Sequence, residues 1–425
     1  MASISELPRG NAVIGQSGGP TAVINQSLVG VIEGLRSGLH AAGVVNRVLG
    51  MRHGVRGLTS GTGDFHDFTD THQDVLDRIG ATPSAALGST RDKPDAGYCE
   101  RILAACRAND IRYFFYIGGN DSSDTCRIIS EMARGAGWDM RCFHVPKTVD
   151  NDLVENDHTP GFPSAARFVA MACMADFLDN ISLPGIKINV VMGRHAGFLT
   201  AASALARRHD LDQGESTDGP QLIYVPEVPF DTERFVAEVE AIYAKRKRCH
   251  LVVSEGIVDK DGVAIGARLI KSGQVDSHGN VQLSGSGALG DGLGDLLKER
   301  LTPAGGKPPR IRADTFGYVQ RCWPDPSWID QMEARRSGHY AAQLALGGHQ
   351  DGSVAIVRQG SGSAQWLGKD GQPYLSTFRR VDLKSVAAKT RHMPAAFLNG
   401  HNNVSRAFIE YCLPLVGELP GFERL

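Results

Sequence analysis

The chain has 425 residues and a nearly balanced charge, with 45 Lys and Arg against 47 Asp and Glu and a net charge of −2. This balance argues against a general nucleic-acid binder, which needs a strongly basic surface. At 42% hydrophobic and 22% charged residues, a globular protein is expected, and the chain is too long for one ordinary core. No apolar run is long enough for a membrane span or a signal peptide. Eight scattered cysteines without a CxxC pair predict reduced thiols and a cytoplasmic location.

Short β-branched and aromatic runs alternate with helical patterns along the chain. In the first half, strands are predicted at 11–15, 44–50, 113–118 and 141–146, with helices at 21–39, 96–109 and 122–137. In the second half, strands are predicted at 186–192, 221–227, 251–255 and 310–318, with helices at 163–181, 196–208, 232–247 and 326–346. Nearly continuous apolar strands are typical of parallel sheets covered by helices on both faces. The pattern therefore predicts a fold of two doubly wound α/β units.

The spacing of these elements also predicts domains. A crossover between the units is expected at 160–163, and the Gly/Ser-rich text at 271–309 is interpreted as an insertion. After about residue 347 a C-terminal extension is expected, with a hairpin at 353–359 and 365–369 and a terminal helix. The predicted domains are 1–160, 161–325 with the insertion, and a segment at 326–425 that packs back on both.

Ligands of such sheets bind beyond the carboxyl ends of the strands, so the loops there are candidate sites. The first strand ends in Gly18-Gly19-Pro20, with Pro20 expected at the first helical position. Glycine backbone and a helix N-terminus suit a phosphate, although the loop lacks the GKS or GKT of a P-loop. The third strand ends in the motif GGNDS at 118–122, which again opens a helix.

The fourth strand ends in a dense polar cluster, PKTVDND at 146–152. It places Lys147, Thr148, Asp150 and Asp152 within six residues. A cation, a hydroxyl and spaced carboxylates suit phosphoryl transfer, because they neutralise charge, hold a metal and accept a proton.

Strand ends of the second unit carry arginines and a glutamate. They include the motif MGR at 192–194, Glu255, and the stretch 310–321 with Arg312 and Arg321. Arginine reads phosphate with two hydrogen bonds, and glutamate accepts from sugar hydroxyls. These residues favour a phosphorylated sugar as the substrate.

Taken together, Gly18-Gly19, GGNDS, PKTVDND, MGR, Glu255 and GYVQR at 317–321 resemble the phosphofructokinase family, and specifically its pyrophosphate-dependent branch. The resemblance covers about residues 11–345. It implies reversible transfer of a phosphoryl group from pyrophosphate to the 1-hydroxyl of fructose 6-phosphate, a step of glycolysis that gives fructose 1,6-bisphosphate and phosphate. It also implies Mg²⁺ as the cofactor and a homodimer or homotetramer, with no nucleic-acid or membrane partner.

The resemblance gives each matching position a role. Asp150 resembles the catalytic base, and Lys147 and Asp121 are catalytic positions beside it. The donor-binding positions are Gly19, Arg91 and Gly119, and the metal positions are Asn120 and Asp152. The sugar-phosphate positions are Thr148, Met192, Gly193, Arg194, Glu255, Arg312, Tyr318 and Arg321.

The choice of donor depends on two of these positions. ATP-dependent members of the family have glycines where this chain has Asp121 and Lys147. A carboxylate at 121 would occupy the place of a nucleotide α-phosphate and repel it. The ammonium of Lys147 would meet the charge of pyrophosphate in the transition state.

Two positions depart from the family pattern. Asn120 stands where an aspartate usually binds the metal, and an amide is a weaker ligand for a hard cation. Gly185 stands where the family has an arginine that crosses a subunit interface, and Lys187 is the nearest candidate substitute.

Three alternatives remain open at this point. One is a kinase that uses ATP or ADP, and another is a catalytically inactive regulatory subunit, which loss of Asp150 or Arg194 would mark. The third is a nicotinamide dehydrogenase, because Gly285 to Gly290 read GxGxxG. That motif is interpreted as a loop, since the dinucleotide fingerprint requires a strand before it and a helix after it.

Overall fold

The computed structural model describes residues 4–93, 95–208, 218–269, 287–360 and 373–423. The backbone packs into two compact units. The first comprises Met1–Ser164 and Arg321–Arg391, and the second comprises Ala165–Gln320 and His392–Leu425. The chain therefore enters each unit twice. The division into domains at 1–160, 161–325 and 326–425 stays a prediction.

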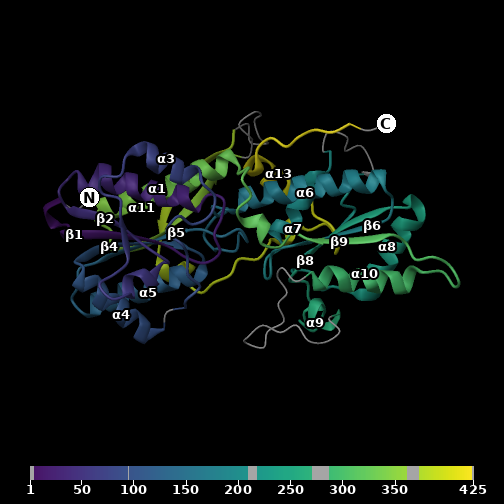
Figure 1. The fold of residues 1–425 in the computed structure, drawn as a ribbon, viewed down its shortest axis with the longest axis horizontal. Coiled ribbons are helices and arrows are strands. Elements are labelled where there is room, and N and C mark those ends of the chain that lie inside the picture. Colours follow the sequence, from purple (N-terminus) through teal and green to yellow (C-terminus); the bar gives the residue numbers. More distant parts are fainter. Residues whose placement is uncertain (1–3, 94, 209–217, 270–286, 361–372, 424–425) are drawn as a thin grey trace. The chain divides into compact units, whose positions relative to one another are not determined.

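The first unit is built on a seven-stranded sheet with the order β11-β10-β5-β4-β1-β2-β3. Five neighbouring strands run parallel, and the edge strands β3 and β11 run antiparallel to β2 and β10. The strands are β1 Gly10–Gln16, β2 Val45–Met51, β3 Phe65–Asp67, β4 Ile111–Gly118, β5 Arg141–Pro146, β10 Asp351–Gln359 and β11 Leu375–Val381 (Figure 1). The central strands are buried on both faces, as their apolar sequence predicts.

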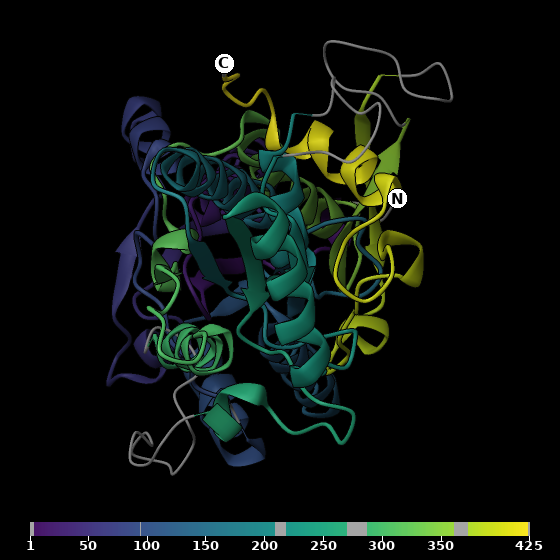
Figure 2. The ribbon, with the colours of Figure 1, turned by 90° about the vertical axis from the view of Figure 1, so that its right-hand side faces the viewer.

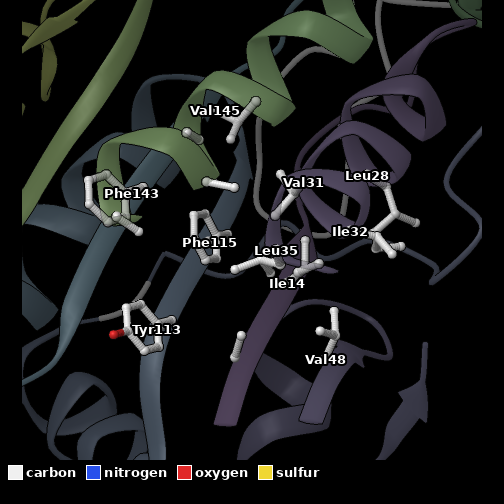
Figure 3. Packing of buried hydrophobic residues seen from close by; sticks show 14 of the residues in the cluster. Ile14, Leu28, Val31, Ile32, Leu35, Val48, Tyr113, Phe115, Phe143 and Val145 are labelled. Atoms are coloured by element: carbon white, nitrogen blue, oxygen red, sulfur yellow. The ribbon is translucent and has the colours of Figure 1, made fainter. Parts of the chain in front are cut away.

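Helices cover both faces of this sheet. Helices α1, α3 and α11 supply or enclose one core cluster, which contains Ile14, Phe115 and Phe143 of the sheet together with Leu28 and Ile32 of α1 (Figure 3). The rings of Phe115 and Phe143 are stacked with their centroids 5.6 Å apart. Helices α2, α4 and α5 cover the opposite face. The helical elements of the unit are η1 Ile4–Glu6, α1 Ile24–Leu35, η2 Arg36–His40, α2 Val55–Thr59, α3 Gln73–Ala81, α4 Ala96–Ala108, α5 Asn120–Gly135, α11 Trp328–Leu346 and α12 Leu383–Val386.

The second unit has a four-stranded, fully parallel sheet with the order β7-β8-β6-β9. Its strands are β6 Ile186–Val191, β7 Leu222–Tyr224, β8 Cys249–Ser254 and β9 Ile311–Thr315. Its helical elements are α6 Phe162–Ser182, which starts in the first unit, α7 Phe198–Ala202, η3 Ser203–Ala206, α8 Thr232–Arg246, α9 Ile265–Leu269, α10 Ala288–Leu301, η4 Gly317–Arg321, η5 Ala395–Phe397 and α13 Arg406–Val416. Figure 2 shows these helices around the strands of the sheet. Helices α8 and α10 enclose its core.

The predicted fold class is confirmed, with two α/β units on parallel sheets. The predicted first helix is wrong at its start, because α1 begins at Ile24 and the chain around Pro20 is irregular, with bends. The helix predicted at 196–208 is shorter in the structure, where α7 and η3 together cover residues 198–206. Among the described residues, no helix is both long and apolar enough to cross a bilayer.

The segment 271–309, interpreted as an insertion, is in part helical, and its being an insertion stays a prediction. Residues 288–301 form α10, whose Leu289, Leu293 and Leu297 are buried in the core of the second unit. Gly290, the last glycine of the GxGxxG match, lies inside this helix, so the loop interpretation is wrong there. Gly285 lies outside the described residues, as does the predicted strand at 365–369. Among the described strands, the antiparallel partner of β10 is β11.

Candidate active site

Three loops of the first unit meet at one edge of its sheet. They follow β1, β4 and β5, which are neighbours and parallel, so their carboxyl ends lie side by side. The chain leaves β1 toward β2 on one side and returns to β4 on the other. A parallel sheet binds ligands at such a reversal of strand order. The fold thus places the motifs that follow these strands together.

The loop after β1 passes close to two cationic side chains. Gly18 has φ +76°, and a Cβ there would lie 3.0 Å from the Nζ of Lys147. A Cβ on Gly19 would lie 2.8 Å from the Cζ of Arg321. The hydroxyl of Ser89 donates to the Gly18 carbonyl at 2.6 Å, which fixes the loop. Glycine is therefore required here both for the backbone conformation and for the approach of the cations.

Lys147 is buried beneath this loop. Its Nζ donates to the carbonyl of Gly19 at 2.8 Å, and the residue is 3% exposed. Burial lowers the pKa of Lys147 to about 8, and repulsion from Arg321 and Arg91 adds to this, while Asp150 and other carboxylate charge act in the opposite direction. A buried ammonium under a glycine loop, with two arginines near enough to lower its pKa, is suited to a multiply charged anion.

The loop after β4 leads directly into α5. Gly119 is the N-cap, and Asn120 and Asp121 lie in the first turn. Backbone N–H groups at a helix N-terminus favour an anion. A Cβ on Gly119 would meet only the Lys147 carbonyl, at 3.7 Å. Asp121 is exposed and forms an ion pair with Lys93 at 3.3 Å.

The loop after β5 carries the carboxylates. The N–H of Asp150 donates to the hydroxyl of Thr148 at 3.1 Å. The carbonyl of Asp152 accepts from the N–H of Arg391 at 2.7 Å, so a segment far along the chain holds the loop. Burial and repulsion by Asp150 raise the pKa of Asp152. The two carboxylates therefore oppose each other's charge, and a cation between them would relieve this repulsion.

Asn120 and Asp152 are suited to a divalent metal. The Nδ2 of Asn120 lies 3.4 Å from the Oδ2 of Asp152, and the Oδ1 of Asn120 is buried without a hydrogen-bond partner among the described residues. A buried carbonyl oxygen without a partner is costly unless a donor or cation binds it. Within the described ranges, no cluster of three or more His, Cys, Asp or Glu side chains could hold a metal. Mg²⁺ needs none, since it keeps waters and substrate phosphates as ligands.

In the second unit, the loop after β6 has a backbone conformation that glycine adopts readily and other residues rarely do. Gly193 has φ +131°, and its carbonyl accepts from the Ser254 hydroxyl at 2.5 Å. The N–H of Met192 donates to the Oε1 of Gln320 at 3.3 Å. A Cβ on Gly256 would lie 2.1 Å from the Arg194 carbonyl. The backbone of this loop is thus fixed, while the Arg194 side chain is exposed.

Of the other predicted residues of the second unit, Glu255 and Tyr318 follow strands, whereas Arg312 lies near the start of one. Glu255 follows β8, is 6% exposed, and donates its N–H to Val191 at 2.9 Å, so it lies at the same sheet edge as the β6 loop. Tyr318 follows β9 in η4 and is 51% exposed. Arg312 lies near the amino end of β9, opposite Lys187 in the register, so the unit does not bring it to that edge.

The candidate substitute for the interface arginine is already paired within its own unit. The Nζ of Lys187 lies 3.0 Å from Asp176 and 2.5 Å from Asp314. Its side chain is only 11% exposed. Lys187 is therefore an internal ion-pairing residue in this unit.

Sequence reasoning missed residues that act through hydrogen bonds to the loops. Gln320 and Ser254 hold the β6 loop, and Lys93 pairs with Asp121. Lys93 follows the donor position Arg91 by two residues, which is a signal that could have been read. Gln320 lies inside GYVQR, but its contact with Met192 depends on tertiary structure.

Two α/β units with polar, glycine-rich loops at their strand ends define a phosphate-handling protein of the doubly wound class. The phosphofructokinase family model matches residues 11–345. The chain is 48% identical to the pyrophosphate–fructose 6-phosphate 1-phosphotransferase of Rhodospirillum rubrum, covering 98% of this chain and 97% of that protein. It is 36% identical to the same-named protein of Halomonas elongata, covering 97% and 94%.

The comparison with solved structures also finds a pyrophosphate-dependent phosphofructokinase. The pyrophosphate-dependent phosphofructokinase of Nitrosospira multiformis superposes with a TM-score of 0.78 at 31% identity, covering 97% of this chain and 94% of that one. The chain belongs to the phosphofructokinase family. Phosphotransferases of this family generally use a divalent metal, in keeping with the oxygen atoms of Asn120 and Asp152.

Proposed function

We propose that this chain transfers a phosphoryl group reversibly between pyrophosphate and the 1-hydroxyl of fructose 6-phosphate, giving fructose 1,6-bisphosphate and phosphate. The observation that carries the proposal is the environment of Lys147. Its ammonium lies under Gly18 and Gly19, close to the charges of Arg321 and Arg91 and of Asp150. Relatives that match almost the whole chain are named for this reaction.

In this proposal, each candidate site residue of the first unit that follows here has a role. Asp150 accepts the proton of the 1-hydroxyl as its oxygen bonds to the transferred phosphorus. The bridging P–O bond of pyrophosphate then breaks, and phosphate leaves with the electron pair. Lys147, Arg91 and the backbone of Gly19 and Gly119 neutralise charge on the donor. Mg²⁺, held by Asn120 and Asp152, would supply further charge neutralisation at the phosphate oxygens.

Donor choice follows from Asp121 and its partner. The carboxylate stands in the first turn of α5, where a nucleotide phosphate would otherwise meet the helix N-terminus. Lys93 holds it there at 3.3 Å. A longer donor would have to displace this pair and approach a negative charge, whereas pyrophosphate ends before it.

The second unit binds the sugar phosphate in this proposal. Met192, Gly193 and Arg194 form a fixed loop, and Glu255 lies at the same edge. The family resemblance adds Tyr318 and Arg312 of this unit, with Arg312 near the amino end of β9, and Thr148 and Arg321 of the first unit. Arg321 also lies against Gly19, so we assign it to the donor as well.

The proposal includes location and assembly. None of the eight cysteines, all of which lie in the described ranges, forms a disulfide, and seven are buried, which supports a reducing compartment such as the cytoplasm. A homodimer or homotetramer is proposed from the family resemblance. Sedimentation of the purified protein tests the assembly, and a monomer would contradict it.

A donor panel tests the function. Fructose 6-phosphate is incubated with Mg²⁺ and either pyrophosphate, ATP or ADP, and fructose 1,6-bisphosphate is measured through aldolase. We expect turnover with pyrophosphate as the donor and none with ATP or ADP. Asp121→Asn removes the charge at constant size, and Asp121→Ala also removes the bulk, so the pair separates repulsion from steric exclusion of ATP. Efficient turnover of ATP by the wild-type protein would identify a nucleotide-dependent kinase, and no turnover with any donor would identify an inactive subunit.

A further inference from the structure

A buried cluster of charged side chains lies behind the loop that carries Asp150. At its centre is His158, whose Nδ1 is 2.8 Å from the Oδ2 of Asp157 and whose Nε2 is 2.6 Å from the Oε2 of Glu333. The side chains of His158 and Glu333 are each about 1% exposed. The imidazole is thus enclosed between two carboxylates, one from its own segment and one from α11.

The surrounding elements complete the cluster. The hydroxyl of Tyr374 donates to the other oxygen of Glu333 at 2.6 Å. From β10, the guanidinium of Arg358 lies 3.0 Å from the Oδ2 of Asp157. Asp330, one turn before Glu333 on α11, accepts from the N–H of Gly161 at 2.9 Å. From the segment after β11, Arg391 donates to the carbonyl of Asp157 at 2.6 Å.

This geometry requires a doubly protonated ring. Both ring nitrogens face carboxylate oxygens, and only imidazolium can donate from both. Burial lowers the pKa of His158, but attraction to Glu333 and hydrogen bonds to both carboxylates outweigh it and raise the pKa to about 9. The cation in turn holds Glu333 ionised, because its attraction lowers the pKa of Glu333 against the effect of burial.

The residues that follow His158 connect this cluster to the candidate active site. The hydroxyl of Thr159 donates to the carbonyl of Thr148 at 2.9 Å, and the carbonyl of Pro160 accepts from the N–H of Thr148 at 3.2 Å. Thr148 in turn accepts from the N–H of Asp150. The hydrogen bonds of Thr159 and Pro160 to Thr148, and of Asp150 to the Thr148 hydroxyl, therefore connect the position of His158 to that of Asp150.

We propose that His158, held between Asp157 and Glu333, is a positioning residue that fixes Thr148 and Asp150 in the geometry for phosphoryl transfer. The inference rests on the proposed function. Buried ion pairs contribute little net stability compared with apolar groups of the same shape, which favours a role in fixing geometry. The cluster collects groups from α11, β10 and the segments on either side of β11 onto one short stretch of backbone.

Glu333→Gln tests this, because it keeps the shape of the side chain and removes one charge. The side-chain amide carbonyl of the variant still accepts from the Nε2 of His158 when the ring is protonated. Without the second carboxylate the ring loses its proton at lower pH, since a neighbouring opposite charge is worth about 1–3 pKa units. The ratio of wild-type to variant kcat should therefore be near one at pH 6 and rise toward about tenfold at pH 8.5.

In the ratio of the two kcat values, the effect of the titration of Lys147 cancels, because it is common to both proteins. KM values for both substrates should stay within about twofold, because Asp150 is misplaced rather than a binding group lost. Glu131→Gln, on the exposed surface of α5, is the matched control and should give a ratio of one throughout. A deficit that is the same at every pH, with a melting temperature lowered to match, would overturn the proposal in favour of a purely structural role.

A second readout is independent of turnover. In protein with ¹⁵N-labelled histidine, the wild-type His158 should remain imidazolium at pH 8, and in the variant it should be neutral. The backbone amide signals of Thr148 and Asp150 should shift with that titration. Absence of any shift at these two amides would contradict the inference even if pyrophosphate proves to be the donor, and their shift would support it even if the donor is another.

Discussion

Asp150 is the residue on which the proposed chemistry depends most directly. Asp150→Asn keeps the size of the side chain and removes its ability to accept a proton. We predict a fall in kcat of about 10²–10⁴, with KM values nearly unchanged, because general base catalysis is lost while binding is retained. Asp74→Asn on exposed α3 serves as the control. Near-full turnover of the Asp150 variant would show that another group takes the proton.

Lys147 has a proposed role in donor binding, and its buried charge has a cost in stability. Its pKa is lowered from 10.5 to about 8 in the folded protein, so between these values the unfolded chain binds the additional proton. The cost of the buried charge is fully present below pH 8 and is relieved as the pH rises through this window. Lys147→Met should therefore raise the free energy of unfolding at pH 7 by up to about 3 kcal/mol while turnover with pyrophosphate is lost.

Urea denaturation at several pH values measures this effect. The gain should shrink as the pH rises from about 8 toward 10.5. Lys384→Met, at a position 79% exposed, should change stability little at any pH. An equal gain in the free energy of unfolding at pH 7 and pH 10 would mean that burial does not disfavour the charged form of Lys147.

The positions of the candidate site residues in the loops after strands could be predicted from the sequence better than their surroundings could. Lys147, Thr148 and Asp150 follow a buried strand directly, so their placement at the sheet edge follows from strand position. The approach of Arg321 to Gly19 joins residues 302 positions apart, and the pairing of His158 with Glu333 joins residues 175 apart. No local pattern carries such information, because these contacts depend on how α11 packs.

At the scale of elements, the pair α1 and α11 is held together by glycines. A Cβ on Gly30 would lie 1.9 Å from the carbonyl oxygen of Arg335, and one on Gly338 would lie 2.2 Å from that of Ser27. Alanine gains up to about 1 kcal/mol in helix propensity. Overpacking against backbone costs about 1–3 kcal/mol and should win.

Gly30→Ala is therefore predicted to destabilise the protein by a net ~1–2 kcal/mol. Gly135→Ala provides the control, because a Cβ there meets nothing within 4 Å, and it should be neutral or stabilising. Thermal unfolding of the two variants compares them directly. Equal stabilisation by both would mean that α1 and α11 can separate without cost.

The elements themselves were predicted where the apolar period was clear. Strands β1, β4, β5 and β6 lie where the continuous apolar runs placed them. Helix α10 was missed because Gly290, Gly292 and Gly294 suggested a loop, although Leu289, Leu293 and Leu297 have helical spacing. Packing explains the glycines, since a Cβ on Gly290 would lie 3.1 Å from Ala313 and 3.2 Å from Val190. Tertiary packing here overrides a poor helix propensity.

At the scale of the whole molecule, the two units should separate the two substrates. Arg194 belongs to the second unit, and Arg321 lies against the donor loop of the first. Arg194→Ala should raise the KM for fructose 6-phosphate about 10–100-fold and leave the KM for pyrophosphate unchanged, as for a lost charged hydrogen bond. Arg321→Ala should raise both. Arg300→Ala, an exposed ion-pair partner of Glu233, is the control. An equal effect of the Arg194 variant on both substrates would contradict this division.

The donor itself is the central claim, and ³¹P NMR of one reaction mixture tests it most directly. With enzyme, Mg²⁺, fructose 6-phosphate and pyrophosphate, the pyrophosphate signal should fall while phosphate and the 1-phosphate of fructose 1,6-bisphosphate rise in equal amounts. Addition of excess phosphate and fructose 1,6-bisphosphate should restore the pyrophosphate signal. Hydrolysis of pyrophosphate without formation of the 1-phosphate, or formation of the 1-phosphate only when ATP is added, would contradict the account.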